Sequence, residues 1–376
     1  MQPDKQIQIR EQNALSQVSS FIRITNKLLT LYDDGNYEEL PVFRANNNRT
    51  GAYNTQGVNN LTGLALKFHH LSGVNSTPLI YQNYILFGSE SRSFFAIDKH
   101  SGEEIWSFKT AKEVRSSAVV HKKTVYFGGF DTFFYALNLE NGILRWKFKT
   151  NDWIFSSAVY HDHSIYFGGM DKCFYALDAH SGKLKWKFET NGWIISSPAI
   201  YKDKIYFGSR DKYIYALDWK NGNLIWKFKT GAGVHSSPAI SNNVIFAGCL
   251  DNNLYAINTA DGSLLWKAKT ANAIFSSAAV KEHFVVIGSK DASLHCFDAR
   301  NGNKIWQFEA QRAVHSSPAI CNNVVYCGSD DGNLYAIDLK TGSELWRYIT
   351  SEKIRSSVVA EDGKIYFGGK YLHVLF

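Results

Sequence analysis

Short runs of β-branched and aromatic residues alternate with small polar turns along most of the chain. The unit from Ser196 to His235, SSPAIYKDKIYFGSRDKYIYALDWKNGNLIWKFKTGAGVH, contains four such runs, separated by KD, SRDK and KNGN. Asp, Asn and Gly favour turns, while the runs between them have the composition and length of β-strands. The pattern therefore predicts four strands in each unit.

The same unit recurs at an interval of forty residues. A tryptophan stands in the fourth run of seven units: Trp106, Trp146, Trp186, Trp226, Trp266, Trp306 and Trp346. A serine begins the first run of eight units: Ser76, Ser116, Ser156, Ser196, Ser236, Ser276, Ser316 and Ser356. Four strands in such a repeat are typical of a propeller blade. We therefore expect an all-β fold, an eight-bladed β-propeller of four-stranded blades.

The eighth unit reaches only its third strand, at KYLHVLF. Its fourth strand can come from the N-terminal side, because LALKFHHLSGVNST aligns without gaps on LIWKFKTGAGVHSS and places Leu66 at the tryptophan position. We expect residues Leu64 to His70 to complete the eighth blade, which closes the ring and removes its free edges.

Two domains are predicted, an N-terminal extension at residues 1–41 and the propeller at residues 42–376. In the extension, ALSQVSSFIRITNKLLTLY has apolar residues at nearly helical spacing, which predicts an amphipathic helix. That helix either packs on the propeller, binds a partner or plugs the central channel.

Composition and charge narrow the function classes. Hydrophobic residues make up 45% of the chain, yet no run approaches the roughly 18 apolar residues of a membrane span, and the N-terminus lacks the apolar core of a signal peptide. The net charge is +7, but the basic residues are scattered, so we do not expect nucleic-acid binding. The five cysteines form no CxxC pair, and reduced thiols are the simplest interpretation. We expect a cytoplasmic protein.

The segment FGSRDKYIYALDWKNGNLIW resembles the repeat of the pyrroloquinoline-quinone (PQQ)-like propellers, which include quinoprotein alcohol dehydrogenases and the β-propeller lipoprotein of the outer-membrane assembly complex. The matching residues are Ala216, Asp218, Gly222 and Trp226, and VFRANNNRTGAY (Val42 to Tyr53) is similar to the family's lead-in to the first blade. The resemblance implies that each tryptophan lies flat against the neighbouring blade and bonds its backbone through the indole nitrogen. It implies little about function, since one propeller fold carries many activities.

One position varies from unit to unit although its neighbours are nearly constant. It follows a β-branched residue and precedes the Ser-Ser pair, and alternation along the strand turns its side chain away from the core between blades. We expect these eight residues to ring the mouth of the channel: Asn75, Arg115, Phe155, Ile195, His235, Phe275, His315 and Arg355. Trp153, Trp193, Phe130 and Met170 are expected to extend its apolar side, and nearby loops to make that face basic through Lys172, Arg210, Lys212, Lys290 and Lys370.

This ring predicts a ligand with an anionic end and an apolar or aromatic body. Guanidinium groups bind carboxylates and phosphates in bidentate fashion, and aromatic rings cover the rest of such a ligand. The partner is thus an anionic small molecule, or an acidic or C-terminal peptide segment of a partner protein. The alternative is that the ring only fills the channel, with the arginines bridged by water or by Glu90 and Asp330.

Catalytic chemistry has less support. The quinoprotein resemblance would require adjacent cysteines and acidic calcium ligands at the mouth, which the sequence lacks, so no cofactor or metal is predicted. His235 and His315 are the general-base candidates, and Cys249 is interpreted as a small-residue replacement. The aspartates of one turn position are expected to bond backbone: Asp131, Asp171, Asp211, Asp251, Asp291 and Asp331.

We expect a non-catalytic binding or scaffolding propeller. The alternative is a cytosolic enzyme of small-molecule biosynthesis that uses the same mouth, with His235 and His315 as acid-base groups and the two arginines as anion-holding groups.

Overall fold

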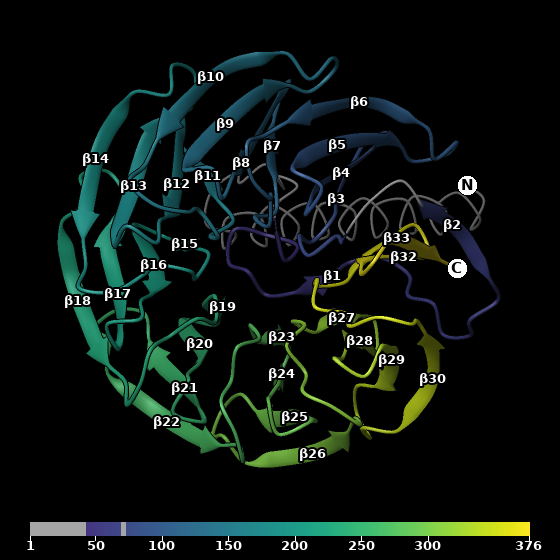
Figure 1. The fold of residues 1–376 in the computed structure, drawn as a ribbon. Coiled ribbons are helices and arrows are strands. Elements are labelled where there is room, and N and C mark those ends of the chain that lie inside the picture. Colours follow the sequence, from purple (N-terminus) through teal and green to yellow (C-terminus); the bar gives the residue numbers. More distant parts are fainter. Residues whose placement is uncertain (1–42, 69–72) are drawn as a thin grey trace, which may run out of the picture. The chain divides into compact units, whose positions relative to one another are not determined.

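The computed structural model describes residues 43–68 and 73–376, and all regular secondary structure in these residues is β-strand. The strands form a ring of eight sheets (Figure 1). The prediction of an all-β, eight-bladed propeller is confirmed. Contacts divide the chain between Glu39 and Leu40, and the predicted helical extension, residues 1–41, lies outside the described residues.

Each blade is an antiparallel sheet whose first strand is innermost. Blades 1 to 4 consist of β3 (Leu79–Tyr81), β4 (Tyr84–Ser89), β5 (Ser93–Asp98) and β6 (Glu104–Lys109); β7 (Val119–His121), β8 (Thr124–Gly128), β9 (Phe133–Asn138) and β10 (Leu144–Lys149); β11 (Val159–His161), β12 (Ser164–Gly168), β13 (Cys173–Asp178) and β14 (Leu184–Glu189); β15 (Ala199–Tyr201), β16 (Lys204–Gly208), β17 (Tyr213–Asp218) and β18 (Leu224–Lys229).

The second half of the ring repeats this order. Blades 5 to 7 consist of β19 (Ala239–Ser241), β20 (Val244–Gly248), β21 (Asn253–Asn258) and β22 (Leu264–Lys269); β23 (Ala279–Lys281), β24 (Phe284–Gly288), β25 (Ser293–Asp298) and β26 (Lys304–Glu309); β27 (Ala319–Cys321), β28 (Val324–Gly328), β29 (Asn333–Asp338) and β30 (Glu344–Ile349). A further short strand, β1 (Ala52–Tyr53), pairs in parallel with β27.

The eighth blade is shared between the two ends of the chain. It consists of β31 (Val359–Glu361), β32 (Lys364–Gly368), β33 (Leu372–Leu375) and, outermost, β2 (Leu64–Phe68). Leu64 pairs with Leu375 and Phe68 with Leu372. The predicted closure by an N-terminal strand is confirmed, and the last two residues predicted for it, His69 and His70, lie outside the described residues.

Neighbouring blades meet at a glycine that lies at or next to the end of each second strand. A Cβ atom on Gly208 would collide with the side chain of Val234 in the next blade, and a Cβ on Gly368 would overlap Val74, which carries the same contact across the ring closure. Val234 and Val74 are fully buried. The repeated glycine therefore sets how closely the blades approach.

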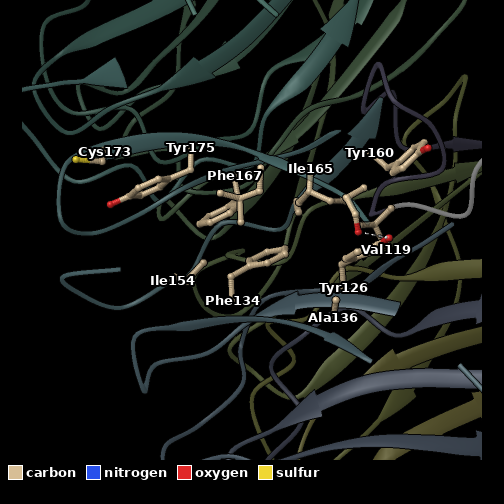
Figure 2. Close-up of a cluster of buried hydrophobic side chains, with 13 residues drawn as sticks. Val119, Tyr126, Phe134, Ala136, Ile154, Tyr160, Ile165, Phe167, Cys173 and Tyr175 are labelled. Carbon is tan, nitrogen blue, oxygen red and sulfur yellow. Dashed lines mark hydrogen bonds between the residues drawn. The ribbon is translucent and has the colours of Figure 1, made fainter. Parts of the chain in front are cut away.

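Aromatic residues fill the space between blades farther from the axis. In Figure 2, the ring of Phe134 from β9 faces that of Phe167 from β12 in the next blade, and the two ring centroids lie 4.2 Å apart. Ile154, Ile165 and Tyr175 belong to the same buried cluster. Burial of this apolar surface is the main stabilising contribution to the contact between blades.

The tryptophans behave as the resemblance implies. The indole Nε1 of Trp226 donates a hydrogen bond of 3.2 Å to the carbonyl oxygen of Thr259 in the next blade. The ring of Trp226 also covers Gly262, which occupies the position in that blade that Gly222 occupies in its own. Gly262 has a φ of +73°, so its turn needs glycine both for its conformation and for the close approach of the ring. The same bond and contact recur from blade to blade.

The repeated aspartates bond the backbone, as predicted. Asp211 Oδ2 accepts hydrogen bonds from the backbone N–H of Asn191 at 3.0 Å and the hydroxyl of Tyr215 at 2.7 Å. Its Oδ1 accepts from the N–H of Tyr213 at 3.2 Å. These aspartates therefore fix the turn and the end of the preceding blade's outer strand, and they form no ring of free carboxylates.

Candidate functional site

One cavity of about 400 Å³ gathers the eight variable residues of the repeat. Its walls are Asn75, Arg115, Phe155, Ile195, His235, Phe275, His315 and Arg355, one from each blade. Each blade also contributes a hydroxyl residue, and Phe43 completes the lining. Because all eight blades contribute, the cavity lies on the propeller axis. We call it the mouth cavity; that it binds a ligand stays a prediction.

The hydroxyl residues form a hydrogen-bonded belt around the mouth cavity. The backbone N–H of Ser197 donates to Ser237 Oγ at 3.0 Å, and the same link joins most successive blades. Across the ring closure, the N–H of Ser357 donates to Thr77 Oγ1 at 3.1 Å. These hydroxyls hold neighbouring blades together.

Two buried arginines of the lead-in, which were not among the predicted site residues, fill the channel. Arg49 donates to the carbonyl oxygens of Pro198 at 2.9 Å and Ala158 at 2.9 Å. Arg44 donates to the carbonyl oxygens of Ala278 and Pro318 on the other side of the ring. Burial lowers the pKa of Arg44 to about 10 and that of Arg49 to about 9, so both remain cationic at neutral pH.

The lead-in backbone follows the inner strands around the axis. The carbonyl oxygens of Asn48 and Thr50 accept hydrogen bonds from the N–H groups of Ile240 at 2.8 Å and Val280 at 2.7 Å, in blades 5 and 6. β1 then continues onto β27 of blade 7. With Phe43 in the cavity lining, the lead-in makes the mouth a pocket with a base.

One side of the mouth cavity carries an ion pair between blades 1 and 2. Arg115 Nη2 lies 2.8 Å from Glu90 Oε1, and the same carboxylate oxygen accepts from Asn75 Nδ2 at 2.5 Å. The Arg115 guanidinium also lies over the ring of Phe130, 5.3 Å from its centroid. Its Nε is buried without a hydrogen-bond partner.

A second ion pair joins blades 7 and 8. Arg355 donates to both oxygens of Asp330, at 2.8 Å from Nε and 2.7 Å from Nη2, and Nδ1 of His315 lies 3.2 Å from the same carboxylate. Burial opposes ionisation of Asp330, but Arg355 and His315 together hold its pKa below the usual value. Arg115 and Arg355 are thus each paired with a carboxylate, that of Glu90 and that of Asp330. This is the pairing that the alternative of a merely filled channel predicts.

The opposite side of the mouth cavity is apolar. Phe155, Ile195 and Phe275 form it, and the exposed fraction of Phe155 is 38%. Trp153 and Trp193 lie outside the lining: Trp153 stacks on Phe130 with centroids 4.9 Å apart, and the guanidinium of Arg210 covers Trp193 at 5.3 Å.

Within the apolar side, His235 of blade 5 lies between Ile195 of blade 4 and Phe275 of blade 6, and it packs edge-on against Phe275 with ring centroids 5.1 Å apart. Burial, with the nearby charge of Arg210, lowers the pKa of His235 to about 4, so the ring is neutral at pH 7. Its Nε2 is buried and has no hydrogen-bond partner. Cys249 in the same blade is fully buried, and burial raises the pKa of its thiol to about 11, which disfavours the nucleophilic thiolate.

Solved structures share this architecture at low sequence identity. BamB from Moraxella catarrhalis superposes with a TM-score of 0.71 and 15% identity over 83% of this chain and 98% of that one. Quinohemoprotein alcohol dehydrogenase from Comamonas testosteroni gives 0.79 and 14% over 89% and 80%, and the computationally designed Ika8 protein gives 0.75 and 16% over 84% and 100%. Such identities establish the fold alone.

Family models match two stretches of the sequence. Residues 49–153 match the model described as outer membrane protein assembly factor BamB, and residues 156–323 match that of the beta-propeller of the beta-alanine-activating enzyme. The chain is a PQQ-like eight-bladed β-propeller. No curated protein matches this PQQ-like propeller in sequence.

Within the described part of the PQQ-like propeller, no three His, Cys, Asp or Glu side chains are placed to hold a metal ion together. All five cysteines, Cys173, Cys249, Cys296, Cys321 and Cys327, are buried and free of disulfides. Residues 43–68 and 73–376 contain no helix long and apolar enough to cross a membrane. The absence of a cofactor and the cytoplasmic location stay predictions.

Proposed function

We propose that this PQQ-like propeller is a non-catalytic binding protein whose mouth cavity receives the end of an anionic, partly aromatic ligand or a peptide segment. One observation carries the proposal: the residues that vary across an otherwise regular repeat all line a single cavity. A volume of about 400 Å³ lies in the range of small-molecule sites. If these eight positions only helped to close the ring, the same residue could stand in every blade.

The two sides of the mouth cavity match the two ends of such a ligand. Phe155, Ile195 and Phe275 offer an apolar surface for a ring. Arg115 and His235 each keep a buried nitrogen without a partner, and buried polar groups are usually hydrogen-bonded. A ligand carboxylate would supply an acceptor for the Nε of Arg115, whereas His235 would lie beside the ligand's ring, next to Phe275. Arg355 is fully engaged by Asp330, so we assign anion capture to Arg115.

The alternative enzyme function is favoured by one contact, the bond between Asp330 and Nδ1 of His315. A carboxylate in that position orients a histidine for proton transfer. Burial nevertheless lowers the pKa of both His315 and His235; that of His235 falls to about 4, and a base whose pKa lies well below the working pH transfers protons poorly. We therefore propose binding over catalysis, by a cytoplasmic protein whose cysteines are all free.

Titration with phenylacetate and phenylacetamide tests the proposal, because the two compounds share a ring and a size and differ in charge. We expect phenylacetate to bind about tenfold more tightly, which corresponds to about 1.4 kcal/mol. Arg115→Gln removes that preference, whereas Phe275→Ala weakens both compounds. Arg300→Gln is the matched control, since Arg300 pairs with Asp298 and its side chain is 73% exposed.

Two results contradict the proposal. If both compounds bind equally, and Arg115→Gln does not change their affinity, the ligand need not be anionic and that part of the proposal is wrong. No binding of either compound, or of a peptide that ends in a phenylalanine carboxylate, removes the binding role of the mouth cavity.

A further inference from the structure

The outer strands of four consecutive blades carry a concentration of positive charge. β10 has three basic residues, β14 two basic and one acidic, and β18 and β22 two basic residues each, so their net charge is +8. This exceeds the +7 of the whole chain. By contrast, β6, β26 and β30 each carry one basic and one acidic residue and are neutral.

The same four strands share a two-residue pattern. Lys147, Lys187, Lys227 and Lys267 occupy equivalent positions, each opposite a tyrosine of the neighbouring strand, and all are exposed. Three residues earlier stand Leu144, Leu184, Leu224 and Leu264, which are 39%, 44%, 44% and 44% exposed. Blades 1, 6 and 7 have Glu104, Lys304 and Glu344 in place of the leucines. In blade 8, Leu64 and Lys67 repeat the pattern, but neither neighbouring blade does.

Protection of sheet edges does not account for this distribution. Lysines on edge strands prevent edge-to-edge pairing, and every blade has an outer edge to protect. Three blades protect it with mixed charges and no excess of either sign. Exposed aliphatic residues occur on the neutral strands as well, at Ile105, Ile305 and Leu345, so the excess of positive charge is what distinguishes the four strands. Among the nine cations of the four strands, the described residues provide an ion pair only for Lys187, 2.8 Å from Glu189.

We propose that the outer strands β10, β14, β18 and β22, here called the cationic wall, bind an acidic, flexible segment of a partner protein. Figure 1 shows the four strands along one continuous arc on the outside of the ring, so the wall is convex. A flexible chain follows such an arc, whereas a flat bilayer touches only part of it and duplex DNA resists bending so sharply. The acidic residues meet the lysines while apolar residues between them cover the leucines.

The leucines favour a protein segment over a single-stranded nucleic acid. Proteins that bind single strands offer exposed aromatic rings on which bases stack. On the cationic wall the exposed apolar residues are aliphatic, while Trp146, Trp186, Trp226 and Trp266 are partly buried and bonded to the next blade. Surface lysines with aliphatic neighbours instead match a segment that mixes Glu or Asp with Leu or Ile.

Fluorescence anisotropy with a peptide that repeats Glu-Glu-Leu-Ser tests this proposal. The peptide is expected to bind the unmodified chain, more tightly than its Glu-Glu-Ser-Ser analogue and less tightly as salt rises. A variant with Lys147→Gln, Lys187→Gln, Lys227→Gln and Lys267→Gln is expected to bind about tenfold or more weakly, since four exposed charge contacts of a few tenths of a kcal/mol each are lost. Its melting temperature should be unchanged because all four side chains are exposed.

The matched control changes net charge by the same amount on the neutral blades, through Ser107→Glu, Gln307→Glu, Lys109→Gln and Arg347→Gln. It is expected to bind the peptide like the unmodified chain. Absent peptide binding, or an equal loss in both variants, overturns the proposal. So does tighter binding of oligothymidylate, or of phosphatidylcholine–phosphatidylserine vesicles, than of the peptide. None of these results bears on the mouth cavity.

Discussion

The indole Nε1 of Trp346 donates a hydrogen bond of 2.8 Å to the carbonyl oxygen of Val58, 288 positions away in the sequence. In the blades built from continuous chain, the corresponding bond spans 33 positions, as between Trp226 and Thr259. The segment before β2 thus replaces the turn that a continuous eighth blade would supply. The contact that joins blades along the chain also joins its two ends.

Replacement of Trp346 by Phe tests this closure, with Trp226→Phe as the matched control. Each change removes one hydrogen bond, and each carbonyl keeps a second donor, Tyr326 at Val58 and Tyr206 at Thr259. We expect both variants to lose about 1 kcal/mol of the free energy of unfolding in urea titrations. A neutral Trp346→Phe beside a destabilised Trp226→Phe would show that the ends are not joined in this way.

Two adjacent glycines test the packing between blades 8 and 1. A Cβ on Gly368 would overlap the carbonyl oxygen of Val74, whereas the nearest atoms to a Cβ on Gly369 are 4.0 Å away. Gly368→Ala is therefore expected to lower the free energy of unfolding by about 1–3 kcal/mol, as overpacking does. Gly369→Ala should change it by less than about 0.5 kcal/mol. Equal effects in thermal denaturation would contradict the contact.

The periodic features of this chain were accessible from sequence, and the unique ones were not. The eight serines that begin the first run of each unit, together with the seven tryptophans, sufficed for the blade count. The gapless alignment placed Leu64 in the fourth strand of the eighth blade. Arg44 and Arg49 lie outside the repeat and have no equivalents in the blades. Their partners are backbone carbonyl groups of blades far apart in sequence, which no sequence pattern encodes. Their role could not be read from the repeat.

The residues of the mouth cavity were likewise predicted only in part. Alternation placed one residue per blade in the cavity lining, including Phe155, but the extension of that argument to Trp153 does not match the lining. Trp153 and Phe155 both precede the inner strand β11, in a segment without regular strand structure, so the two-residue period of a strand does not fix the direction of either side chain. From the sequence, the pairing of Arg115 with Glu90 was one of two alternatives, because the conformation of the loops decides it.

Stability should fall as the pH drops from about 6.5 to about 4, and His235 should contribute to the fall. Its pKa is lowered from 6.5 to about 4 in the folded chain, so between these values the unfolded chain binds the proton and the folded chain does not. The contribution is complete above pH 6.5 and amounts to at most about 3 kcal/mol. Urea titrations across this range should give His235→Gln a shallower pH dependence. Parallel curves for both proteins would contradict the buried neutral state of His235.

The most direct test of the binding role is a crystal structure of the chain with 4-bromophenylacetate, in which anomalous scattering locates the bromine. We predict the bromine between Phe155 and Phe275 and the carboxylate against Arg115. Bromine found only on the outer surface, or an unoccupied mouth cavity at saturating ligand, would contradict the account.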